Sequence, residues 1–92
     1  MRVEVVRRGG VVGVALPGSI DPSELPPEVA DQAVAALSRL PFGVPPAAPR
    51  HPDCFQYEIT VVDGGKRRRA VLDEAQVPPA LQPLLKAALE RG

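Results

Sequence analysis

One stretch, Phe55 to Asp73, constrains the fold of this chain more than any other. It consists of two runs rich in β-branched and aromatic residues, separated by Gly64 and Gly65. Both glycines tolerate positive φ, which a two-residue primed turn needs so that its twist matches the twist of the paired strands. The turn fixes the register and predicts four facing pairs: Asp63–Lys66, Val61–Arg68, Ile59–Ala70 and Tyr57–Leu72.

The same register divides this ribbon into an apolar face and a polar face, because side chains alternate along a strand. The apolar face is expected to carry Phe55, Tyr57, Ile59, Val61, Ala70 and Leu72. The polar face is expected to carry Gln56, Glu58, Thr60, Arg67 and Arg69, with Val62 and Val71 among them. A slip of one residue would bury arginines, so the pattern predicts that the first face lies on the core.

Length, charge and cysteine content narrow the class of protein. Residues 1–92 are expected to form one small domain with a single core. Eleven basic and eleven acidic residues give a formal net charge of zero, which argues against nucleic acid or an anionic membrane as a partner. The lone Cys54 excludes an internal disulfide, and with only His51 beside it no structural zinc site can be assembled. Met1 leads into a charged strand with no signal peptide or membrane span, so we expect a soluble, cytoplasmic protein without cofactors.

A second glycine pair, Gly9-Gly10, predicts another hairpin over Arg2 to Leu16. A two-residue turn there would pair Val3 with Leu16, Val5 with Val14 and Arg7 with Val12. A bulge at Val5-Val6 or near Gly13 would shift these pairs. Pro17-Gly18 is expected to end the second strand of this hairpin.

Two proline pairs indicate where helices begin. Pro26-Pro27 suits the first turn of a helix, where a missing N–H is tolerated, and Pro41 ends that helix. Pro78-Pro79 precedes a second helix, whose start Pro83 makes irregular. Apolar residues at three- and four-residue spacing give each helix one stripe: Val29, Ala33, Ala36, Leu37 and Leu40 in the first, and Leu81, Leu84, Leu85, Ala88 and Leu89 in the second.

The order of elements is strand, strand, helix, strand, strand, helix. It predicts an α+β fold: a two-layer sandwich in which a four-stranded sheet, built from two β-hairpins, packs against one or two helices. The strand order stays open. Parallel first and fourth strands would place the two glycine turns at opposite ends of the sheet, whereas an antiparallel central pair would let both turns meet one partner. The proline-rich segment from Phe42 to Cys54 is expected to be extended, stiff and exposed.

Catalytic residues are not expected in this chain. His51 and Cys54 form the one conceivable nucleophile pair, but three residues apart in an extended segment their side chains diverge. No third group orients them, and neither glycine pair lies between a strand and a helix as a phosphate loop would. The basic run Lys66 to Arg69 is divided between two strand faces and neighbours Glu58 and Asp63. The residues therefore favour a small binding module rather than an enzyme with a small-molecule substrate.

Several motifs resemble the emfourin family. They are the opening Met-Arg-Val-Glu-Val, Arg-Arg-Gly-Gly-Val with Gly13 after it, Pro-Asp-Cys-Phe-Gln-Tyr-Glu-Ile-Thr-Val, Asp-Gly-Gly, Val-Leu-Asp-Glu, and Val-Pro-Pro-Ala-Leu-Gln-Pro-Leu-Leu near the end. Emfourins are small bacterial proteins named for inhibiting thermolysin-like zinc metalloproteases, protealysin among them. The resemblance implies a protein that blocks the active-site cleft of a thermolysin-like metalloprotease with a rigid surface. The oligomeric state stays open at this level, and we expect a monomer when the protein is free.

The expected protease-contacting residues lie in the first glycine turn and the proline-rich loop: Arg8, Gly9, Gly10, Val11, Pro45, Pro46, His51 and Asp53. A subsidiary hypothesis is that Asp53, His51 or Cys54 reaches the zinc of the protease and displaces its catalytic water. Steric blocking is favoured over metal capture. The alternative function is a non-catalytic interaction domain that pairs through an exposed sheet edge and has no protease target.

Overall fold

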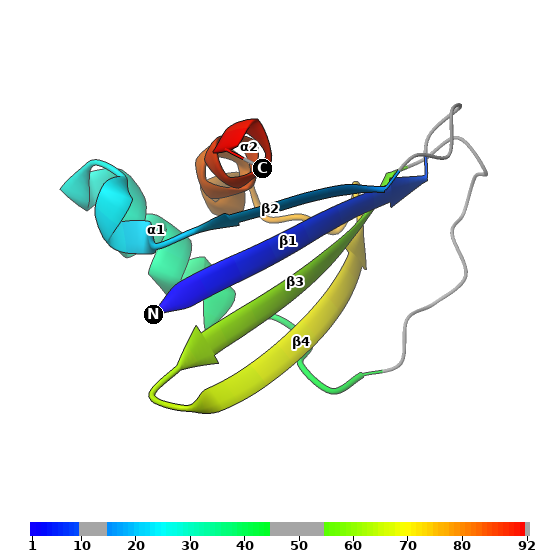
Figure 1. The fold of residues 1–92 in the computed structure, drawn as a ribbon, viewed down its shortest axis with the longest axis horizontal. Helices are drawn as coiled ribbons and strands as arrows, with labels where there is room; N and C mark the ends of the chain where they lie inside the picture. The colour runs from blue at the N-terminus through cyan, green and yellow to red at the C-terminus, as the bar shows by residue number, and fades with distance from the viewer. Residues whose placement is uncertain (10–14, 45–54, 92) are drawn as a thin grey trace.

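The computed structural model of this chain describes residues 1–9, 15–44 and 55–91. Its elements are β1 (Arg2–Gly9), β2 (Leu16–Ile20), the 3-10 turn η1 (Pro22–Glu24), α1 (Pro27–Leu37), β3 (Phe55–Asp63), β4 (Lys66–Asp73), the 3-10 turn η2 (Pro79–Leu81) and α2 (Gln82–Arg91). Within these residues, four strands form one antiparallel sheet in the order β2-β1-β3-β4. Both helices lie on the same face of the sheet (Figure 1). The predicted α+β fold with a four-stranded sheet is confirmed.

The hairpin of β3 and β4 has the predicted turn and register. Gly64 and Gly65 have φ of 57° and 82°, as a primed two-residue turn requires. All four predicted pairs occur, from Asp63 with Lys66 at the turn to Tyr57 with Leu72. The predicted core face is also correct, because Ile59, Val61, Ala70 and Leu72 are at most 3% exposed.

The register predicted for the first hairpin is wrong. Val3 pairs with Ile20, Val5 with Gly18 and Arg7 with Leu16, so the second strand lies four residues later than a two-residue turn at Gly9-Gly10 requires. Residues 10–14, which include the predicted partners Val12 and Val14, lie outside the described part of the chain. The observed pairing buries Ile20, at 3% exposed, whereas Leu16 is 39% exposed. Burial of Ile20 against the core therefore outweighs the tight turn.

Pro17 and Gly18 lie within β2, although they were expected to end a strand. Proline is tolerated there because β2 is an edge strand of the sheet. Gly18 has a packing role, because α2 passes directly over it. A Cβ at this position would lie 2.6 Å from the carbonyl carbon of Ala88, closer still to its oxygen, and 3.0 Å from the Cα of Leu89. The missing side chain is what lets helix and strand backbones touch.

The apolar stripes of both helices pack on the sheet as predicted. Ala33, Ala36 and Leu37 of α1 and Leu84, Leu85 and Ala88 of α2 are buried, together with Leu40 and Leu81 just outside the helices. Val29 and Leu89 are half-buried. The expected irregular start of the second helix is the 3-10 turn η2, which runs directly into α2. Within the described residues, neither helix is long and apolar enough to span a membrane.

The chain after α1 differs from the expectation of a fully exposed segment. Phe42 is half-buried and packs against the core. The guanidinium of Arg68 lies 4.6 Å from the centroid of its ring, and the backbone N–H of Gly43 donates to the carbonyl of Arg69 at 3.1 Å. When the chain folds back here, more of the apolar surface of Phe42 is removed from water than in an extended segment. The expectation for residues 45–54 falls outside the described residues.

Asp21 caps η1 and makes its stability depend on pH. Its carboxylate accepts a hydrogen bond from the backbone N–H of Ser23 at 3.0 Å, and the Glu24 carboxylate accepts one from the N–H of Asp21 at 2.9 Å, which completes a capping box. The bond from the Ser23 backbone holds the pKa of Asp21 below its usual 3.8. The folded state therefore binds this proton less readily than the unfolded state, so the contribution is complete above the usual pKa and is lost as pH falls through the lowered value.

We expect Asp21→Ala to lower the melting temperature more at neutral pH than at acidic pH, where protonation of the wild-type carboxyl removes its charge. Thermal unfolding of both proteins at both pH values measures the difference. Asp21→Asn is the control, because it keeps an acceptor that does not titrate. An equal loss at both pH values in Asp21→Ala would show that the charge of Asp21 contributes nothing.

Candidate functional site

The first segment predicted to contact a protease and the C-terminal side of the second join the sheet at the same end. β1 finishes there at Gly9, β2 begins at Leu16, and β3 begins at Phe55, which is the register partner of Gly9. Residues 10–14 continue from Gly9, and residue 54 precedes Phe55. We call this end of the sheet, where β1 finishes and β3 begins, the Gly9 end. It lies on the right in Figure 1.

The Gly64-Gly65 turn lies at the opposite end of the sheet. Its neighbour Val62 pairs with Arg2, at the start of β1. The central pair β1–β3 is antiparallel, yet the expectation that such a pair lets both glycine turns meet one partner is wrong. Each turn follows the first strand of its own hairpin, β1 or β3. Because these two strands are antiparallel, they finish at opposite ends of the sheet. A partner at the Gly9 end is therefore remote from Gly64 and Gly65.

Two of the predicted contact residues are described by the structure. Arg8 and Gly9 lie at the Gly9 end, and Gly9 has a φ of 89°, which a residue with a side chain rarely adopts. The other predicted contact residues fall outside the described residues: Gly10, Val11, Pro45, Pro46, His51 and Asp53. Cys54 does too, so the hypothesis of a zinc-reaching side chain stays a prediction. The described residues contain no group of three potential metal ligands.

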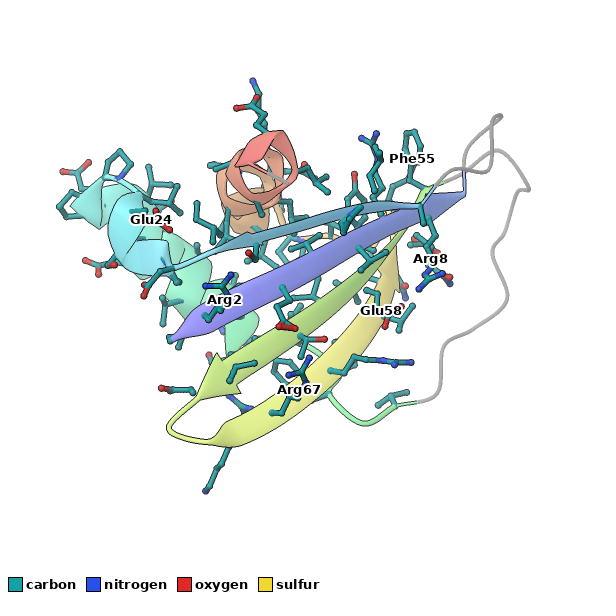
Figure 2. All side chains as sticks on the ribbon, viewed as in Figure 1. Arg2, Arg8, Glu24, Phe55, Glu58 and Arg67 are labelled. Atoms are coloured by element: carbon teal, nitrogen blue, oxygen red, sulfur yellow. The ribbon has the colours of Figure 1, made fainter. Side chains whose placement is uncertain are left out.

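Arg8 is held by a carboxylate on the helix-free face of the sheet. Its Nε lies 3.3 Å from Oε2 of Glu58, whose other oxygen, Oε1, lies 3.2 Å from Nη1 of Arg69. Arg67 pairs separately with Glu4 at 2.7 Å. Figure 2 shows Arg8 and Glu58 on one side of the sheet and Phe55 on the other. The basic run was expected to neighbour Glu58, and the Arg69 contact confirms it.

We expect Glu58→Gln to lower the free energy of unfolding by at most about 1 kcal/mol, because ion pairs this exposed are screened by water. The side chains of Arg8 and Arg69 are 57% and 61% exposed, against 22% for Glu58. The loss should shrink in about 1 M salt, which screens charges over a few ångströms. Denaturant unfolding at low and high salt measures it, with the exposed Glu74→Gln as control. A loss that is independent of salt would contradict an electrostatic origin.

A hollow of about 430 Å³ opens on the opposite face of the sheet, beside α2. It is lined by Arg7, Leu16 and Tyr57 from the strands and by Gln82, Leu85, Lys86, Leu89 and Glu90 from the helix. The guanidinium of Arg7 lies 4.3 Å from the centroid of the Phe55 ring, a cation–π distance. The sequence interpretation did not include this hollow among the candidate sites. The available signal was an arginine on the same strand face as Val3 and Val5.

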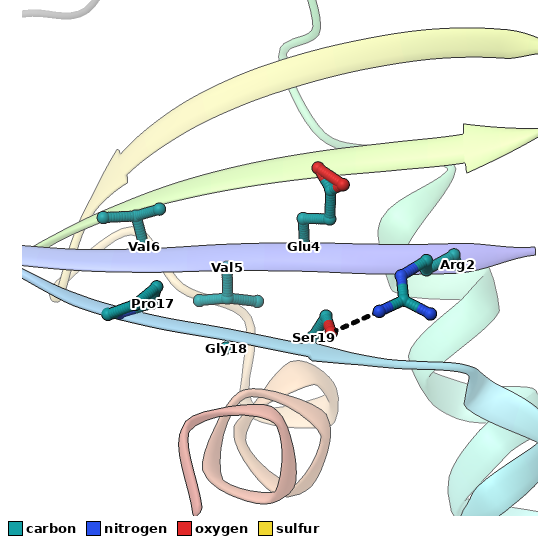
Figure 3. Close-up of a pocket in the computed structure, with 7 residues that line it drawn as sticks. All are labelled: Arg2, Glu4, Val5, Val6, Pro17, Gly18 and Ser19. Carbon is teal, nitrogen blue, oxygen red and sulfur yellow. Dashed lines mark hydrogen bonds between the residues drawn. The ribbon is translucent and has the colours of Figure 1, made fainter. Parts of the chain in front are cut away.

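A second hollow, of about 390 Å³, lies between β1 and β2 on the helix-free face. Figure 3 shows Arg2 donating a hydrogen bond to the hydroxyl of Ser19, at 2.8 Å, along its rim. The carboxylate that lines this hollow, Glu4, is already paired with Arg67. Arg2 and Glu4 thus bond to other side chains of the protein rather than converge on a ligand.

Comparison with known proteins gives a family and no individual relative. The family model described as Emfourin matches residues 5–89, nearly the whole chain. The match covers β1 from Val5 onward, every residue that lines the hollow beside α2 except Glu90, and the sheet end to which the predicted contact segments attach. Neither a curated protein nor a solved structure matches this chain.

Proposed function

Because the chain belongs to the emfourin family, we propose that it inhibits thermolysin-like zinc metalloproteases by blocking the active-site cleft. One structural observation supports this function most directly. The first predicted contact segment continues from Gly9, the second leads into Phe55, and these two residues are register partners in the centre of the sheet. A single partner surface placed at the Gly9 end is therefore next to the points where the two segments join the sheet.

The Gly9 end is well suited to hold such segments in place. Phe55 contacts the Arg7 guanidinium on the helix-covered face, and Arg8 pairs with Glu58 on the helix-free face. Below them the central strands β1 and β3 pair over eight residue pairs. Ordered attachment points lower the conformational entropy that docking must cost, which favours tight inhibition. The interface is of ordinary inhibitor size, on the order of 800 Å² from this partner.

In this proposal the contact surface comprises Arg8 and Gly9 with the flanking Gly10, Val11, Pro45, Pro46, His51 and Asp53. This contact surface blocks substrate access by filling the cleft of the protease, without any bond to the zinc. Capture of the metal by His51, Asp53 or Cys54 is the subsidiary form of the proposal. The two forms differ in what the triple substitution of these side chains does.

The test is an activity assay of a thermolysin-like protease titrated with the protein. We expect slow, tight loss of peptide cleavage that is complete near one equivalent, with the inhibitor still intact on a gel. Steady degradation of the domain excludes inhibition. Undiminished cleavage with an intact domain at every ratio leaves the alternative, an interaction domain without a protease target.

The triple variant His51→Ala, Asp53→Ala, Cys54→Ala separates the two forms of the proposal. Steric blocking predicts an inhibition constant raised by no more than about tenfold, or about 1.4 kcal/mol of binding, because two contact side chains are shortened. Metal capture predicts a loss of several orders of magnitude. Thermal unfolding of the variant confirms that the fold is kept.

A further inference from the structure

The hollow beside α2 combines an apolar lining with cations at its rim. Leu16, Tyr57 and Leu89 supply apolar surface, and Leu16 is 39% exposed. Arg7 and Lys86 bring two positive charges to the hollow, against the one negative charge of Glu90. Its volume of about 430 Å³ leaves room for one or two side chains of a partner. The site thus matches an apolar side chain that lies next to a carboxylate.

Arg7 differs from the neighbouring arginines in how it is held. Arg8, Arg67 and Arg69 each form an ion pair with a glutamate. In the part of the chain that the structure describes, Arg7 stacks on Phe55 and forms no ion pair. Stacking occupies the face of a guanidinium and leaves the N–H groups along its edge, which match the two oxygens of a carboxylate.

The hollow is continuous with the proposed protease contact. Arg7 directly precedes Arg8, Leu16 begins the strand after residues 10–15, and the ring under Arg7 belongs to Phe55, the first residue after the proline-rich loop. A protein docked on the Gly9 end therefore extends over this hollow. The net positive rim favours an acidic surface on that protein.

We propose that the hollow is a second contact for the protease, and that it receives an apolar side chain of the protease while a neighbouring carboxylate bonds to Arg7 and Lys86. This inference rests on the proposed function. It names the chemistry of the partner surface: an exposed apolar residue beside an aspartate or glutamate at the rim of the cleft. The contact adds specificity, because a protease with a basic rim would meet two cations of like charge.

The experiment compares the inhibition constants of Arg7→Gln and Lys86→Glu with that of the wild-type protein. We expect each substitution to raise the constant at least about tenfold, and Lys86→Glu to slow association most at low salt. Arg67→Gln is the matched control, because Arg67 lies beside the Gly64-Gly65 turn, at the far end of the sheet, and its constant should stay within about twofold of the wild type. Since Arg7 also packs on Phe55, Lys86→Glu on the exposed face of α2 separates binding from folding.

Wild-type inhibition with unchanged constants for Arg7→Gln and Lys86→Glu overturns the inference and leaves the proposed function standing. An equal loss in Arg67→Gln also overturns it, because the effect would then follow overall charge rather than this hollow. A wild-type protein that does not inhibit any thermolysin-like protease overturns both the function and the inference.

Discussion

Replacing Gly18 with valine should lower the free energy of unfolding by about 3 kcal/mol or more, because the new side chain meets backbone atoms that cannot rotate away. The first atom of that side chain would lie 2.6 Å from the carbonyl carbon of Ala88 and 3.0 Å from the Cα of Leu89. The helix α2 must then move off β2, which opens the fully buried contacts made by Ala88. Denaturant unfolding of wild type and variant measures the loss.

The neighbouring position gives a matched control for this substitution. Ser19 lies in the same edge strand, but its side chain lines the hollow on the helix-free face. Ser19→Val adds similar bulk and removes the exposed hydrogen bond from Arg2, so its effect should stay within about 1 kcal/mol. If Gly18→Val were as mild as Ser19→Val, the close approach of α2 to β2 would be wrong.

Truncating Leu84 to alanine should cost about 2–5 kcal/mol of unfolding free energy, because it removes buried methyl groups and leaves a cavity. Leu84 is 0% exposed and lies in α2, between the equally buried Leu81 and Ala88. The helices and the sheet share one core, so the loss should appear as a single cooperative shift of the unfolding midpoint. Chemical denaturation followed by circular dichroism measures that shift.

Leu16→Ala is the control, because it makes the same chemical change at a residue that is 39% exposed. Little area returns to water there, so its cost should stay below about 1 kcal/mol. Similar losses at Leu16 and Leu84 would contradict the burial assigned to α2. The control also bears on the β2 register, since the mispredicted pairing of Leu16 with Val3 would place Leu16 on the core.

The sequence predicts the hairpin of β3 and β4 well because its determinants are local. Gly64 and Gly65 set the turn, and the alternation of apolar and polar residues in the two strands is compatible with only one register. The first hairpin has the same local signal, yet its second strand begins at Leu16. Its register depends on the burial of Ile20 and on contact between Gly18 and α2, which begins more than sixty residues later in the chain. Contacts between residues so far apart in the chain cannot be predicted from the local pattern of residue types.

The candidate site likewise has one part that the sequence predicts and another part that it does not. The placement of Arg8 and Gly9 at a strand end follows from the sequence, because the glycine pair interrupts the strand. The hollow beside α2 does not follow, since it needs Arg7, Tyr57 and Lys86 to be brought together from two strands and a helix. The stacking of Arg7 on Phe55 depends on the antiparallel register of β1 and β3, and the strand order was open at the level of sequence.

The antiparallel β1–β3 pair determines how this protein can be attached to a surface or to a fusion partner. Met1 and the Gly64-Gly65 turn lie together at one end of the sheet. The length of β1, eight residues or roughly 25 Å, separates them from the Gly9 end. Glu90, near the other terminus, lines the hollow beside Arg7 instead. A tag or immobilising linker on Met1 therefore leaves the proposed docking end accessible, whereas one that follows α2 sits beside it.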